Sequence, residues 1–382
     1  MAVTRRTLLR NLGMGAVAGA TVPWVLCATS GAGIVESTRR QAFDGMVLLN
    51  HNESAYGPSP KVMAAMQSAM GMANRYAYMQ SDLLVEEIAN YHGVKREQII
   101  LGCGSREILH VSALAFLGNG KRLVQASPTF EAIEHYARSI DAEVVSIPLT
   151  PESAHDLDSM LTQVTASTGL VYICNPNNPT ASITPRKDLE SFISKLPVTC
   201  CVLIDEAYHH YVKRSALYSS FIDSPVHDER VIVCRTFSGA YALAGLPLGY
   251  GIGSSRRIEL MHAQAAFDVV NVIAARAAAA ALEDTENLRD SIKKTEDARQ
   301  EFVNQATARM LKPIDSHTNF VMMNTRHPAE DVIRHLRQHN VLIGRRFPAM
   351  DTYVRVSLGT REEMQAFWRA WDTLPYPRPT HH

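Results

Sequence analysis

The chain has no excess of charge and no cysteine pair with metal spacing, and each absence excludes a class of protein. Its 382 residues contain 38 Lys and Arg against 38 Asp and Glu, so the formal net charge is zero. A nucleic-acid-binding domain would need a basic face, so this balance argues against a nucleic-acid partner. None of the six cysteines lies in a C-x-x-C pair, so the sequence indicates no metal site. Hydrophobic residues make up 46% of the chain, which is typical of a globular protein.

Long apolar runs are absent after the first 33 residues, so no later segment is expected to span a bilayer. Residues 1–33 begin with a basic stretch that includes Arg5 and Arg6, followed by an apolar stretch rich in Gly and Ala and then by small residues. This arrangement predicts a twin-arginine type of export signal and a periplasmic protein that meets the membrane only transiently. The alternative is a single membrane anchor, which the short apolar length disfavours.

The rest of the chain predicts two folded domains. Residues 34–60 are expected to form an N-terminal arm, because glycine and prolines forbid regular structure at its end. A large domain is expected over residues 61–275, a smaller α+β domain over 276–375, and a tail over 376–382.

The expected large domain alternates apolar strand-like runs with helical periodicity. The predicted strands are 99–101, 123–126, 144–147, 170–174, 201–204, 231–234 and 248–252. This alternation predicts an α/β fold, with a mostly parallel seven-stranded sheet and helices on both faces. Ligands of such sheets bind at the carboxyl ends of the strands.

Polar motifs follow several of these strands. They are NPNNPT at 175–180, DEAY at 205–208, RTFS at 235–238, Gly-Ser at 104–105 and RVSLGT at 355–360. Their order and spacing resemble class I/II aminotransferases of the pyridoxal-phosphate fold-type I superfamily, with the histidinol-phosphate aminotransferases as the most similar group. The resemblance covers residues 45 to 370. It implies a pyridoxal 5′-phosphate cofactor, an amino acid or 2-oxo acid as the small-molecule partner, and a homodimer.

The resemblance implies four residues around the cofactor ring. Asp205 would face the pyridine nitrogen, where a carboxylate holds the ring proton by charge pairing. Tyr208 and Asn178 would hydrogen-bond the ring's 3′ oxygen, and Phe130 would stack on the ring. The alternatives are that Asp205 caps a following helix and that Phe130 is ordinary core packing.

A helix that opens after a strand is expected to bind an anion, and the resemblance implies that this anion is the cofactor phosphate. Backbone N–H groups at a helix N-terminus bind anions, and Gly104, Ser105 and Arg106 lie at such a start. The resemblance adds the hydroxyls of Thr236 and Ser238 on the phosphate side. It also adds Tyr76, which would reach the phosphate of the partner subunit.

The resemblance also places three residues at the substrate. Arg355 would clamp the substrate carboxylate, since its planar fork suits that group. Tyr56 and Asn52, on the arm, would line the substrate entrance. The alternative for Arg355 is a surface charge on a strand.

The pattern breaks at two positions. The resemblance places the lysine that carries the cofactor at Gly239 and a phosphate-binding arginine at Pro247. The catalytic set is therefore reduced to Tyr208 and an empty lysine position. Lys213 is the nearest lysine in sequence, and His209 and His210 lie close to Tyr208 as candidate bases.

Three hypotheses follow from this break. The protein is a working aminotransferase with another base or another lysine. It binds pyridoxal or pyridoxamine phosphate without a covalent link and runs another reaction. It is a non-catalytic, exported binding protein on an enzyme scaffold.

Overall fold

The computed structural model describes residues 45–375 except 119, 214 and 268–269. The predicted export signal, the first part of the predicted arm (residues 34–44) and the predicted tail lie outside the described residues. No described helix combines the length and apolar character needed to cross a membrane. The described cysteines are all free thiols, and all but Cys103 are buried.

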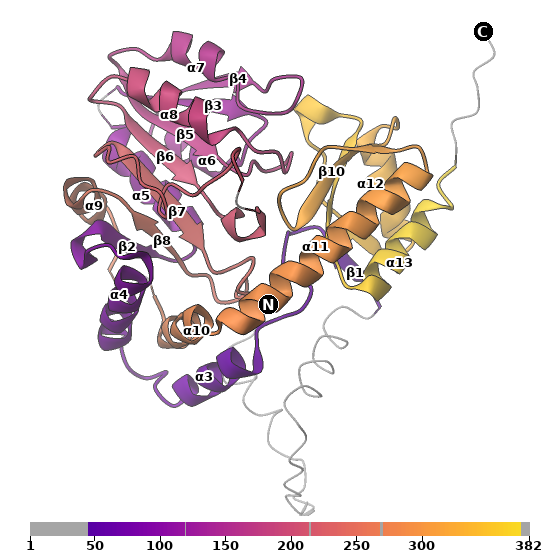
Figure 1. Ribbon diagram of the computed structural model, residues 1–382, viewed down its shortest axis with the longest axis horizontal. Coiled ribbons are helices and arrows are strands. Elements are labelled where there is room, and N and C mark those ends of the chain that lie inside the picture. Colours follow the sequence, from indigo (N-terminus) through magenta and orange to yellow (C-terminus); the bar gives the residue numbers. More distant parts are fainter. Residues whose placement is uncertain (1–44, 119, 214, 268–269, 376–382) are drawn as a thin grey trace, which may run out of the picture. The chain divides into compact units, whose positions relative to one another are not determined.

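A seven-stranded sheet forms the centre of the fold, as the sequence predicted (Figure 1). Its strand order is β2-β8-β7-β6-β5-β3-β4. The strands are β2 (Ile99–Gly102), β3 (Arg122–Ser127), β4 (Glu143–Pro148), β5 (Thr168–Cys174), β6 (Cys201–Asp205), β7 (Val231–Thr236) and β8 (Gly249–Ile252). Every neighbouring pair is parallel except those of β8, which runs antiparallel to β2 and β7.

Helices bury both faces of this sheet because its central strands are apolar on both sides. Alternate residues of β5 enter different cores, with Val171 and Ile173 on one side and Leu170 and Tyr172 on the other. The first core is covered by α3 (Pro60–Met70), α4 (Tyr78–His92), α7 (Leu157–Gln163), α8 (Arg186–Lys195) and α10 (Val272–Glu283). The second is covered by α5 (Ser105–Phe116), α6 (Ala132–Ser139) and α9 (Ser255–His262). Continuous apolar strands of this kind are typical of buried parallel sheets.

The C-terminal part is an α+β unit, which begins with the long helix α11 (Thr285–Ala308) seen in Figure 1. The sequence predicted a helix break near 283–286, and Asp284 there caps α11 by accepting a hydrogen bond from the Asn287 amide. An antiparallel sheet of order β12-β10-β9 follows. The remaining elements are β9 (Lys312–Pro313), β10 (Phe320–Asn324), α12 (Ala329–Gln338), β11 (Val341–Ile343), β12 (Tyr353–Ser357), α13 (Arg361–Trp371) and the 3-10 turns η1 (Arg96–Gln98), η2 (His209–Tyr211) and η3 (Pro348–Met350).

The described start of the chain belongs to this C-terminal unit. Strand β1 (Val47–Leu49) pairs in parallel with β11, and Leu49 is buried in the same core as Phe302 and Trp368. Residues 47–49 were predicted to be part of an extended arm, and they are a strand. The predicted domain boundaries remain predictions.

Candidate functional site

Polar side chains gather where β5, β6 and β7 end. Asp205 is the last residue of β6, and its direct neighbours in the sheet are Cys174 on β5 and Cys234 on β7. The three parallel strands therefore end together, and the loops that follow them share one edge of the sheet. This is the place where α/β sheets bind ligands.

Asp205 is 2% exposed and its carboxylate is held on both oxygens. The Tyr172 hydroxyl donates to Oδ2 at 2.9 Å, and the Ala207 amide donates to Oδ1 at 3.0 Å. Burial raises the pKa of the Asp205 carboxyl, and these two hydrogen bonds act against that rise. The alternative of a helix cap is wrong, because the next turn, η2, starts after Tyr208 and has no side-chain cap.

Four predicted residues meet in one hydrogen-bonded cluster. Asn178 and Asn52 each donate from Nδ2 to the Tyr208 hydroxyl, at 3.2 Å and 3.0 Å. Arg355 donates from Nη1 to Asn178 Oδ1 at 2.7 Å and from Nη2 to the Asn50 carbonyl at 2.9 Å. Burial raises the pKa of Tyr208 to about 12, so its hydroxyl is protonated at neutral pH. The cluster joins the described part of the arm, the loops after β5 and β6, and β12.

Arg355 keeps hydrogen-bonding capacity in this cluster. Its Nε is buried and has no partner, and the rings of Phe320 and Phe347 lie 5.5 and 5.4 Å from its Cζ. Gly344 makes room for it, because a Cβ there would lie 2.8 Å from the Arg355 carbonyl and 3.1 Å from Nε. Sequence reasoning missed Gly344, whose role depends on this close approach.

Helix α5 starts at the same edge of the sheet. Gly104, with φ of +77°, precedes its first residue, Ser105. A Cβ on Gly249 would lie 2.4 Å from the Ser105 amide nitrogen, so only glycine lets β8 pass this close. Pro247 is adjacent, since its Cβ lies 3.7 Å from the Cβ position of Gly104. Pro247 therefore lies beside Gly104, at the start of α5.

The other predicted phosphate-side residues lie around this helix start. Thr236 is the register partner of Gly249, and its hydroxyl is 2.9 Å from that of Ser238. The Arg106 side chain is exposed and lies over the Phe130 ring, with Cζ 5.9 Å from the ring centroid. Phe130 is partly buried against the α5 side of the sheet.

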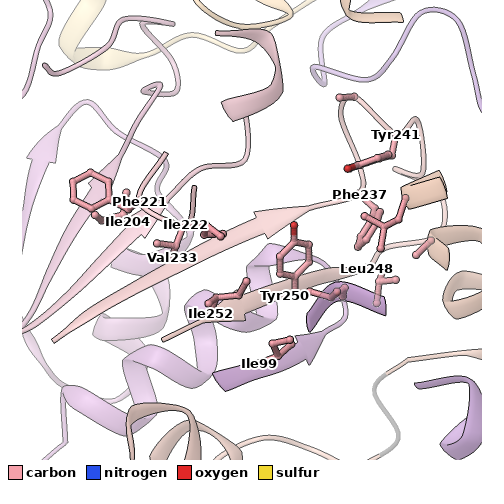
Figure 2. Close-up of a cluster of buried hydrophobic side chains, with 14 of the residues drawn as sticks. Ile99, Ile204, Phe221, Ile222, Val233, Phe237, Tyr241, Leu248, Tyr250 and Ile252 are labelled. Atoms are coloured by element: carbon pink, nitrogen blue, oxygen red, sulfur yellow. The ribbon is translucent and has the colours of Figure 1, made fainter. Parts of the chain in front are cut away.

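Gly239 lies in a segment anchored by the apolar core. Phe237 and Leu248, both fully buried, hold the two ends of this segment through a backbone hydrogen bond of 2.9 Å (Figure 2). A Cβ on Gly239 would find the Tyr211 hydroxyl at 3.5 Å and no closer atom, which is ordinary contact. The site at 239 therefore accommodates a β-carbon without a clash.

The candidate substitutes for the lysine are placed unfavourably. Lys213 is exposed and forms an ion pair with Glu296 on α11. His209 and His210 lie in η2, and burial lowers the pKa of both well below the usual value, which makes them weak bases.

Two predicted residues are not brought to the cluster. Tyr76 is 74% exposed and its ring contacts Tyr78. Tyr56 lies beside α11, with Lys294 Nζ 5.4 Å from its ring centroid, and it lines a cavity of about 730 Å³ between α11 and α13.

Comparison with known proteins decides the family. The sequence model described as aminotransferase class I and II matches residues 44–370. The chain belongs to this family. It is 34% identical to a histidinol-phosphate aminotransferase of Moorella thermoacetica over 343 residues, which is 89% of this chain and 88% of the relative. A relative of the same description from Geobacillus thermodenitrificans is 32% identical over 91% of this chain and 94% of its own length.

Solved structures of aminotransferases share the fold. The histidinol-phosphate aminotransferase of Sinorhizobium meliloti, in complex with pyridoxal-5′-phosphate, superimposes with a TM-score of 0.80 at 27% identity, covering 89% of this chain and 93% of that chain. An aspartate aminotransferase of Thermus thermophilus with maleate has a TM-score of 0.73 at 22% identity, covering 89% and 94% of the two chains, which shows the fold alone. The aminotransferase-like, pyridoxal-phosphate fold-type I assignment is thereby confirmed.

Proposed function

We propose that this aminotransferase-family protein binds pyridoxal or pyridoxamine phosphate without a covalent link, together with an amino acid or 2-oxo acid. The observation that carries the proposal is the convergence of Asp205, Tyr208, Asn178 and Arg355 on one edge of the sheet while position 239 has no side chain.

The chemistry of these groups fits the cofactor. Pyridoxal phosphate supplies an electron sink when bound. Asp205 would hold a proton on the ring nitrogen, and Tyr208 and Asn178 would donate to the 3′ oxygen. The amides at the start of α5 would hold the phosphate together with Thr236. These roles are the ones that the resemblance implied, and two observations support them: the Asp205 carboxylate is buried and hydrogen-bonded, and no side chain of the N-cap residue Gly104 caps the start of α5.

Arg355 defines the substrate class. Its guanidinium is largely buried and has an unpaired Nε, so a ligand carboxylate would complete its hydrogen bonds. The curated relatives are histidinol-phosphate aminotransferases, and for this chain we propose only their amino-acid and 2-oxo-acid chemistry.

Transamination by this site is expected to be weak. A positioned acid–base group contributes roughly 10²–10⁴-fold in rate, and Gly239 cannot supply one. A charge-assisted hydrogen bond contributes about 1.5–3 kcal/mol, which Pro247 cannot make. The joint absence at 239 and 247 favours the second candidate function, a non-catalytic binding protein.

The decisive experiment mixes the purified protein with pyridoxal phosphate, records the visible spectrum, reduces with borohydride and locates any adduct by mass spectrometry. A bound cofactor without an adduct supports the proposal. An adduct on a lysine would show that another lysine serves and would refute non-covalent binding. If the protein binds no pyridoxal phosphate, the proposal fails and the second candidate function, a non-catalytic binding protein, is favoured.

The paired variant Gly239→Lys with Pro247→Arg tests the remainder of the site. Since a Cβ at 239 meets only ordinary contacts, we expect the variant to fold and to gain transaminase activity. Folded but inactive protein that still binds the cofactor would show that more than these two positions is altered.

We further propose that residues 1–33 direct export by the twin-arginine route and that the protein acts in the periplasm. Replacing Arg5 and Arg6 by lysine is expected to retain the protein in the cytoplasm, which cell fractionation measures. Unchanged export would contradict this proposal.

A further inference from the structure

Beneath Asp205 lies a buried tyrosine that the roles above do not use. Tyr172 is fully buried in β5, two residues before Cys174, the direct sheet neighbour of Asp205. It therefore lies on the same face of the sheet as Asp205, diagonally across the strand pair. Its hydroxyl donates to Asp205 Oδ2 at 2.9 Å.

Among the described residues, the groups that act most strongly on the Asp205 carboxyl are hydrogen-bond donors and one carboxylate. Cys174 and Cys234 flank it, and burial raises the pKa of both thiols, so they stay protonated. Glu206, the next residue, adds a like charge but is paired with Arg235 at 2.9 Å. The stabilising donors are thus the Tyr172 hydroxyl, the Ala207 amide and, more weakly, the Cys234 thiol.

We propose that Tyr172 is a positioning residue that keeps Asp205 ionised and turned toward the cofactor ring. This rests on the proposed function, because it assumes that Asp205 faces the ring nitrogen. Tyr172 acts through Asp205 and touches no ligand.

The argument is one of competing free energies at a buried carboxylate. Desolvation favours the neutral acid, and a neutral acid cannot hold a proton on a ring nitrogen by charge pairing. A hydrogen bond donated to the carboxylate favours the anion. Tyr172 keeps its own proton, because burial and the nearby Asp205 raise its pKa well above the usual value. No proton is transferred. The hydrogen bond from Tyr172 shifts the protonation equilibrium of the Asp205 carboxyl toward the ionised form.

The same bond fixes the orientation of the carboxylate. Tyr172 occupies Oδ2 and the Ala207 amide occupies Oδ1, so rotation about the Asp205 side chain would break both bonds. Each oxygen keeps further acceptor capacity for a donor in the site.

The test titrates the Asp205 carboxyl in the protein without cofactor. Aspartate is labelled with ¹³C at the carboxyl carbon, and the Asp205 signal is assigned by its loss in Asp205→Asn. In Tyr172→Phe we expect the titration midpoint of Asp205 to move upward by about one pH unit or more, the order expected for losing a hydrogen bond to a charged group. An unchanged midpoint overturns the proposal.

A matched control comes from Tyr250, another buried tyrosine of the same sheet, whose hydroxyl bonds to His92 Nε2 at 2.9 Å. Tyr250→Phe is expected to leave the Asp205 midpoint in place. If both variants shift it equally, the effect is general to the core and the proposal fails. Should Tyr172→Phe not fold, a fluorinated tyrosine at 172, a stronger donor of the same shape, is expected to lower the midpoint.

The second readout uses pyridoxal phosphate labelled with ¹⁵N in the ring. In the wild type, the ¹⁵N shift of the bound probe is expected to report a protonated nitrogen, and in Tyr172→Phe a larger neutral fraction. Equal protonation in both proteins overturns the proposed role toward the ring. If the probe binds to neither protein, the proposed function fails, whereas the cofactor-free titration still decides whether Tyr172 ionises Asp205.

Discussion

At the scale of single residues, the site depends on close approaches that only small side chains allow. Gly344 and Gly249 each lie where a Cβ would meet backbone atoms under 3.0 Å, whereas Gly239 and Gly245 have open space or ordinary contacts. The glycine at the lysine position is thus not required by packing.

Replacing Gly344 by alanine is expected to displace Arg355. The added Cβ would lie 2.8 Å from the Arg355 carbonyl, and overpacking of this kind lowers the free energy of unfolding by about 1–3 kcal/mol. Urea denaturation measures the change. Gly245→Ala, with nothing within 4 Å of its Cβ position, is the control and should stay within about 0.5 kcal/mol of the wild type. If Gly344→Ala were as stable as the wild type, the close approach of Gly344 to Arg355 would not limit the side chain at 344, and the prediction would be wrong.

The sequence predicted those site residues whose positions follow from strand ends. Asp205 ends a buried strand, Tyr208 and Asn178 follow within four residues of such an end, and the fold brings Asn178 and Tyr208 together with Arg355. Gly344 and Tyr172 were missed, because their contacts are with side chains and backbone from other strands and leave no local pattern. The roles of all these residues toward a cofactor remain predictions.

At the scale of elements, the least predictable piece was β1. Its three residues, VLL, pair with β11 nearly 300 positions later, and no local signal in a short apolar run reveals so distant a partner. The seven strands of the large sheet were predictable, because each is an apolar run bounded by helices and turns.

We expect the inward-facing residue of β1, Leu49, to account for most of what this strand contributes to the free energy of unfolding. Leu49→Ala should lower the free energy of unfolding by about 2–4 kcal/mol, since Leu49 is 1% exposed in the C-terminal core. Leu48 is on the same strand and partly exposed, so Leu48→Ala should cost clearly less. Similar losses from both variants, measured by chemical denaturation, would contradict the pairing of β1 described here.

A buried histidine makes the segment before α7 sensitive to acid. His155 is 4% exposed, its Nδ1 lies 2.7 Å from Thr184 Oγ1, and burial lowers its pKa to about 4. In the unfolded chain His155 binds this proton near pH 6.5. The contribution of His155 to the free energy of unfolding is therefore constant above that pH and falls as the pH drops toward 4. The loss from His155 should reach about 2 kcal/mol at pH 5. His155→Gln should show a shallower decline between pH 6.5 and 5, and an identical slope would exclude His155 as the cause.

At the scale of the whole molecule, the exposed apolar surface around α4 bears on assembly. Tyr78 and Phe267, which are 63% and 95% exposed, line one cavity, and Tyr76 lies against Tyr78. Exposed aromatic clusters of this kind mark interaction sites. They coincide with the residue expected to enter the partner's phosphate site, so we propose a homodimer with this surface at its interface.

Phe267→Ser tests the dimer directly. Losing a buried phenylalanine at an interface removes about 2 kcal/mol, so the dimer dissociation constant should rise by roughly 30-fold in sedimentation velocity. Val198→Ser is the control, since Val198 is 83% exposed but lies after α8, outside this surface. A monomeric wild type would contradict the dimer, and an equal effect of both variants would place the interface elsewhere. If the dimer forms, Tyr76→Phe should leave the dissociation constant unchanged and weaken the binding of pyridoxal phosphate, because only the hydroxyl would reach the partner's phosphate.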